Sequence, residues 1–81
     1  MLIIYHNTVV NMDAVSCIKI EETLLQFYLR ETKVNFTFQT FQKAVEALEL
    51  IKFADRTSAR SVDVSYLSEV AKPQPKNEST K

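Results

Sequence analysis

The 81-residue chain contains no glycine and no tryptophan, and its two prolines, Pro73 and Pro75, both lie near its C-terminal end. Phosphate-binding loops, dinucleotide fingerprints and nucleophile elbows depend on glycine, so the sequence excludes their usual forms. Turns that need a positive φ must use Asn or Asp instead. We expect Asn7, Asn11 and Asp13 to serve in this way.

Cysteine and histidine are equally scarce, with only Cys17 and His6 present. One cysteine excludes an intramolecular disulfide, and one of each excludes the usual Cys/His zinc sites. Cys17 lies among apolar neighbours in an expected strand, where a thiol behaves as a small hydrophobe. Glu21 and Glu22 are adjacent, so their side chains point apart and do not form an acid–base pair. We therefore expect no enzyme, no catalytic residue, no cofactor and no metal.

Charge of either sign is also not concentrated in the body of the chain. Residues 1–71 carry seven basic and nine acidic side chains, a net of −2, whereas residues 72–81 carry three lysines and one glutamate, a net of +2. A slightly acidic body is a poor partner for nucleic acid or an anionic membrane. The apolar start at 1–5 is too short for a signal peptide or a membrane span, which favours a cytoplasmic location.

Alternating apolar residues are the clearest structural signal that is present. Residues 24–30 and 34–38 alternate with period 2 and are separated by a short polar turn at 31–33. This pattern predicts two antiparallel strands of a meander. Residues 2–5 and 14–20 are further strand candidates, and residues 9–12 either extend the first strand or form a hairpin with it.

From residue 40 onward the period changes to that of a helix. Thr40 is an expected N-cap, and Arg56 suits the C-terminal dipole of a helix spanning about 40–56. Glu49 and Lys52 are three residues apart and can form an ion pair on its surface. The apolar stripe expected to face the sheet consists of Phe41, Ala44, Val45, Leu48 and Ile51.

These elements predict an α+β fold in which an antiparallel meander of about four strands carries one amphipathic helix on one face. Residues 62–67 have strand-like alternation but also a spacing of four, so a further short strand there competes with a helix. We expect residues 1–71 to form one domain. The polar segment 72–81 is expected to be a disordered tail.

One helix covers one face of a sheet, so this arrangement leaves apolar residues without a cover. Leu50 and Phe53 fall outside the predicted helical stripe, and Val15, Cys17 and Tyr28 fall on the predicted open sheet face. For the two helix residues the alternative is that the segment after residue 56 folds back over them. Otherwise such surfaces contact another chain.

The function that follows is a small non-enzymatic protein-interaction module with an accessory or regulatory role. We expect a homodimer, because two-fold association is the commonest, and in addition a further protein partner. No membrane partner is expected. The interface residues are Leu50, Phe53, Val15, Cys17 and Tyr28.

The alternative function is single-stranded nucleic-acid binding on a sheet face around Tyr28, Arg30 and Lys33. Aromatic side chains beside basic ones can stack exposed bases. The phenylalanines of the same strands are expected in the core, which leaves Tyr28 almost alone and ranks this function second. An enzyme or ligand carrier with a site formed between subunits ranks third, because one chain supplies few convergent polar groups.

Overall fold

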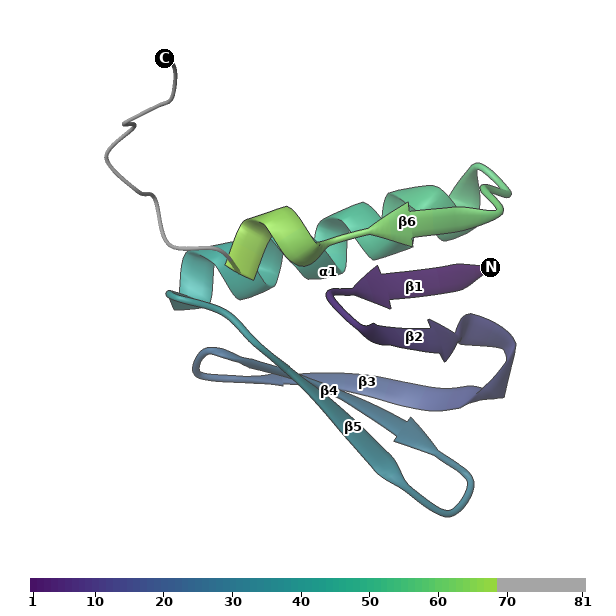
Figure 1. Cartoon of the computed structure of the whole chain (residues 1–81), viewed down its shortest axis with the longest axis horizontal. Coiled ribbons are helices and arrows are strands. Elements are labelled where there is room, and N and C mark those ends of the chain that lie inside the picture. Colours follow the sequence, from purple (N-terminus) through teal and green to yellow (C-terminus); the bar gives the residue numbers. More distant parts are fainter. Residues whose placement is uncertain (69–81) are drawn as a thin grey trace.

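The computed structural model describes residues 1–68, which form six strands, one α-helix and two 3₁₀-helices (Figure 1). In chain order these are β1 (Leu2–Tyr5), β2 (Thr8–Asn11), η1 (Met12–Ala14), β3 (Val15–Glu21), β4 (Leu24–Leu29), β5 (Lys33–Thr37), α1 (Phe41–Arg56), β6 (Ser61–Asp63) and η2 (Ser65–Ser68). The predicted α+β class, with antiparallel strands and one helix packed against them, is confirmed. The predicted domain end at residue 71 and the predicted tail 72–81 lie outside the described residues.

The strands are divided between two three-stranded sheets, in the orders β2-β1-β6 and β3-β4-β5. In Figure 1, α1 runs behind β6 and β1, and the second sheet crosses below them. β1 and β2 form an antiparallel hairpin, whereas β6 lies parallel to β1 with Val62 opposite Ile3. The segment at 62–67, for which the sequence left strand and helix open, contains both, because the short strand β6 is followed by the helical turn η2.

The second sheet is the meander that the alternating residues predict. Leu25 lies opposite Ile20 on one side and Phe36 on the other, and all three residues face the core. Leu25, Phe27 and Phe36 are completely buried. The rings of Phe27 and Phe36 lie 4.5 Å apart, so two adjacent strands supply the aromatic centre of the core.

The turns are built differently from the prediction. Positive φ angles occur at His6 (55°), Glu22 (56°) and Ser58 (61°). The three expected positions, Asn7, Asn11 and Asp13, are wrong. His6 and Glu22 are each the first residue of a two-residue hairpin turn, a place that requires positive φ in a type II′ turn. Asn11 has another task, because its side chain accepts a hydrogen bond from the Asp13 backbone N–H (3.0 Å) and caps η1.

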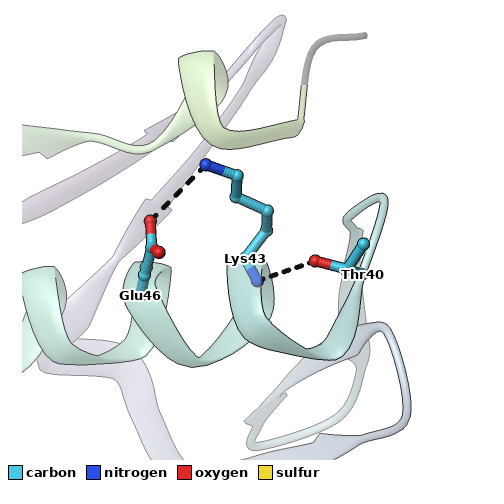
Figure 2. A network of polar contacts seen from close by, with 3 residues as sticks. All are labelled: Thr40, Lys43 and Glu46. Carbon is cyan, nitrogen blue, oxygen red and sulfur yellow. Dashed lines mark hydrogen bonds and ion pairs between the residues drawn. The ribbon is translucent and has the colours of Figure 1, made fainter. Parts of the chain in front are cut away.

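The helix begins and ends where the sequence predicts. The Thr40 hydroxyl accepts a hydrogen bond from the Lys43 backbone N–H at 3.1 Å, which satisfies one of the free donors of the first turn (Figure 2). At the other end the Thr57 hydroxyl donates to the Phe53 carbonyl at 3.0 Å. Arg56 lies in the last turn, where a cation is favourable.

The buried stripe of the helix is rotated relative to the predicted one. Phe41, expected in the core, is 55% exposed. The completely or almost completely buried helix residues are Ala44, Ala47, Ile51 and Ala54. The physical reason is that α1 has a second neighbour besides the sheet: β6 and η2 pack along it, with Val64 and Leu67 buried. Alanines on this stripe let the backbone of α1 lie close to the strands and to η2.

Tyr5 connects the two sheets. Its hydroxyl donates to the Thr37 carbonyl at 2.6 Å and accepts from the Thr37 backbone N–H at 3.1 Å. Its ring stacks on Phe36 with 4.3 Å between the ring centroids. The end of β1 is thereby joined to the edge strand β5 by both polar and aromatic contacts.

Within residues 1–68 no helix is long and apolar enough to cross a membrane.

Candidate functional site

The face of the second sheet that points away from α1 is the first candidate surface. Antiparallel pairing places alternate residues of three strands on it. We call this the open sheet face, and its residues are Cys17, Lys19, Glu21, Leu24, Gln26, Tyr28, Lys33, Asn35 and Thr37. Its residues on the two outer strands are all exposed to solvent, so no element of the described chain covers it.

Tyr28 lies on the central strand of this face with a cation on each neighbouring strand. Its hydroxyl donates to Gln26 Oε1 at 3.0 Å, and Gln26 is only 7% exposed although it is on the open side. The Nζ atoms of Lys19 and Lys33 lie 6.0 and 5.6 Å from the Tyr28 ring centroid. Neither lysine takes part in the ion pairs found among the described residues. The arrangement is a fixed aromatic ring flanked by two cations without an acidic partner.

Of the predicted residues of this face, Cys17 and Tyr28 are on it and Val15 is not. Cys17 is exposed and lies directly opposite Tyr28. Val15 pairs with Leu29 and packs against the core, so its predicted side of the sheet is wrong. The cause is a register shift between Val15 and Cys17, which reverses the alternation for residues before it.

The predicted cations are also brought together only in part. Lys33 is beside Tyr28, but Arg30 lies in the loop after β4 and lines a depression of about 600 Å³ together with Asp13 and Glu31. Lys19 takes the place expected for Arg30 and was missed by the sequence reasoning. A signal was available, because a two-residue turn at residues 22–23 fixes the β3–β4 register and puts Lys19 beside Gln26.

The outer side of the helix carries the second candidate surface. A groove of about 410 Å³ lies between α1 and η2, and we call it the α1–η2 groove. Its lining residues are Gln42, Val45, Glu46, Glu49, Leu50 and Tyr66. Tyr66 is 60% exposed, and Phe53, one helical turn beyond Glu49, is 56% exposed. Several apolar side chains therefore remain accessible to a partner here.

The two residues expected to be uncovered on the helix have different surroundings. Leu50 is partly buried and packs against the core, with η2 beside it. Phe53 is left uncovered, and its ring has the Arg56 guanidinium 5.7 Å away. The segment after residue 56 thus folds back over Leu50 in part and not over Phe53.

Charges along this side of the helix are balanced. Lys43 Nζ lies 3.7 Å from Glu46 Oε1 (Figure 2), and Lys52 Nζ lies 3.5 Å from Glu49 Oε2. The second pair is the one that the sequence predicts. Both pairs are exposed, so they contribute little to stability, but they leave this side of the helix with no net charge.

A polar cluster connects the β1–β2 turn to η2. The His6 backbone N–H donates to Ser65 Oγ at 2.6 Å, and His6 Nε2 lies 2.5 Å from Ser68 Oγ. The Ser68 hydroxyl donates to the Ser65 carbonyl at 2.8 Å, so His6 Nε2–H is the donor toward Ser68. A serine nucleophile needs the reverse arrangement, in which histidine accepts the hydroxyl proton.

Asp63 completes this cluster. Hydrogen bonds from the Ser65 hydroxyl and from the Ser65 backbone N–H hold the pKa of the Asp63 carboxyl below its ordinary value of 3.8, and the positive charge of His6 adds to the effect. Cys17 is not part of the cluster and lies opposite Tyr28 instead. The hydrogen bonds of this cluster connect the β1–β2 turn to η2.

Among residues 1–68 there is no group of three or more His, Cys, Asp or Glu side chains that could hold a metal ion. Comparison of the chain with protein-family models, with curated protein sequences and with solved structures finds no match.

Proposed function

We propose that the chain is a small non-enzymatic protein-interaction module that pairs with a second copy of itself through the α1–η2 groove. The observation that carries this proposal is the groove itself, with Leu50 and Tyr66 in its lining and the ring of Phe53 exposed beside it. Uncovered aromatic residues next to an apolar depression are typical of protein interfaces.

A second copy fits the charges of this surface. In a two-fold interface every contact occurs twice, because a residue of the first copy that contacts a given residue of the second copy has its counterpart in the reverse direction. If two copies of α1 lie antiparallel about Glu49, Lys52 of each copy comes opposite Glu46 of the other. Phe53 then comes opposite Val45, and Glu49 faces its own copy at the axis, where Lys52 of the same chain, 3.5 Å from the Glu49 carboxylate, offsets the negative charge.

Burial of exposed apolar surface also favours association. A chain of this length buries a modest share of its unfolded surface and has a thin margin of stability. Covering the exposed half of Phe53 contributes on the order of 1 kcal/mol per copy, and the two-fold axis doubles it. Burial of Tyr66 in the same interface adds to this gain.

An accessory or regulatory role, in which the dimer binds a further protein, is part of the same proposal. We also propose the cytoplasm as its location, because an exposed thiol such as Cys17 stays reduced there.

The mass of the protein in solution tests the proposal. Light scattering on a gel-filtration column, repeated from micromolar to near-millimolar concentration, is expected to give a mass near twice 9.3 kDa that falls toward 9.3 kDa on dilution. A mass of 9.3 kDa at every concentration contradicts it.

A further inference from the structure

We infer that the open sheet face binds single-stranded nucleic acid, with Tyr28 stacking on a base while Lys19 and Lys33 contact the phosphates on either side. This site lies on the opposite side of the second sheet from α1, so it is independent of the proposed pairing.

Tyr28 is positioned so that a base can stack on its ring. The residue lies on the central strand of a three-stranded sheet and is partly exposed. Its hydroxyl is bonded to Gln26, which is itself almost completely buried, so the ring is held in place before any ligand arrives. A preorganised ring on a sheet surface is the usual platform on which a base stacks, and stacking does not depend on base identity.

Lys19 and Lys33 lie on the two outer strands, one on each side of Tyr28. Neighbouring strands are about 4.8 Å apart, so the two backbones lie about 9.6 Å apart with Tyr28 between them. Both ammonium groups are within 6.0 Å of the ring centroid and have no acidic partner in the described part of the chain. Phosphate groups flanking a stacked base supply that missing counter-charge.

The remaining residues of the open sheet face suit a nucleic-acid strand better than they suit a protein partner. Besides Tyr28 the apolar surface is limited to the small Cys17 and the partly buried Leu24, whereas Asn35, beside Gln26, offers an exposed carboxamide to a base edge. The one acidic residue, Glu21, is at the hairpin end of the face, beyond Lys19. The face is therefore positive and polar around a single ring.

The test for stacking uses a fluorescein-labelled oligothymidylate of about 15 nucleotides, with fluorescence anisotropy at about 20 mM salt. Tyr28→Ala is expected to weaken binding about fivefold to hundredfold, and Tyr28→Phe to retain it, because the ring and not the hydroxyl stacks. Phe41→Ala is the matched control, since Phe41 is also an exposed aromatic residue but lies on α1 and outside the lining of the α1–η2 groove. It is expected to leave binding unchanged.

The test for phosphate contacts uses the salt dependence of the same binding. Two contacts predict a slope of about −1.4 in a plot of log K against log salt, and Lys19→Gln or Lys33→Gln is expected to lower its magnitude by about 0.7. Lys43→Gln is the control, because Lys43 is also an exposed lysine but lies on the helix. The same measurement with oligouridylate distinguishes a preference for DNA from one for RNA. The same measurement with the mononucleotide dTMP distinguishes a site for a strand from a site for a single nucleotide.

The inference is overturned by any of three results. The first is no saturable binding of the oligonucleotide at low salt, the second is an equal effect of Tyr28→Ala and Phe41→Ala on binding, and the third is duplex DNA bound as tightly as the single strand. Protection of the Cys17 thiol from alkylation by bound oligonucleotide is expected, because Cys17 lies opposite Tyr28. A variant that loses the dimer but keeps oligonucleotide binding separates this inference from the proposed function.

Discussion

At the scale of single residues, Tyr5 joins the two sheets by both polar and aromatic contacts, in addition to the shared core. Its hydroxyl makes both of its hydrogen bonds with the backbone of Thr37. Tyr5→Phe keeps the stacking on Phe36 and removes these bonds, so we expect the free energy of unfolding to fall by about 1–2 kcal/mol. Urea unfolding followed by circular dichroism measures the change. Tyr66→Phe is the control, and a loss as large there would contradict the role of Tyr5.

Asp63 is the residue that makes stability depend on acidity. Its pKa is depressed in the folded protein, so its stabilisation is fully present above its ordinary pKa of 3.8 and is lost as the pH falls through the lower folded value. Asp63→Asn is therefore expected to lower the free energy of unfolding near neutral pH, and its effect is expected to shrink as the pH falls through the lowered pKa of Asp63.

Ser65→Ala provides the comparison for this pH dependence, because it removes the hydroxyl that contributes most to the low pKa of Asp63. In the Ser65→Ala background the effect of Asp63→Asn is expected to shrink. An effect of Asp63→Asn that is equally large at low and neutral pH would disprove the account. Thermal unfolding across that pH range measures both.

At the scale of elements, the helix depends on its N-cap. Thr40→Ala leaves the Lys43 backbone N–H without its partner and is expected to cost about 1 kcal/mol, whereas Thr40→Ser is expected to cost a few tenths. Chemical denaturation of the two variants measures the difference. Equal stability of the alanine and serine variants would mean that the cap hydroxyl contributes nothing.

Elements defined by local periodicity could be predicted from the sequence. The alternation of residues 24–38 and the helical spacing after Thr40 are repeated within a few residues, so β4, β5 and α1 follow directly. The pairing of β6 with β1 could not be predicted, because Leu2 and Ser61 are distant in the chain and no local pattern specifies their contact.

Some residues of the candidate sites could be placed from the sequence and others could not. Tyr28, Cys17 and Lys33 are where strand alternation puts them. Val15 was misplaced because a register shift in β3 has no sequence signal such as glycine to mark it. Phe41 was misplaced because the burial of α1 depends on β6 and η2, which return from a later part of the chain.

At the scale of the whole molecule, the core separates two surfaces of different chemistry. The α1–η2 groove combines apolar residues with two glutamates that are each paired with a lysine, whereas the open sheet face carries a tyrosine between two lysines. The helix packs on one face of the second sheet, and Tyr28 lies on the opposite face. A dimer formed through the groove therefore leaves the open sheet face of each copy accessible.

The most direct test of pairing through the groove compares two phenylalanines of α1. In the antiparallel pairing about Glu49, Phe53, which is 56% exposed, comes opposite Val45 of the other copy, whereas Phe41, which is 55% exposed, comes opposite Thr57, just beyond the end of α1. At a concentration where the wild-type mass is near twice 9.3 kDa, we expect Phe53→Lys to give 9.3 kDa by light scattering and Phe41→Lys to keep the dimer mass. Equal masses for the two variants would contradict pairing through this surface.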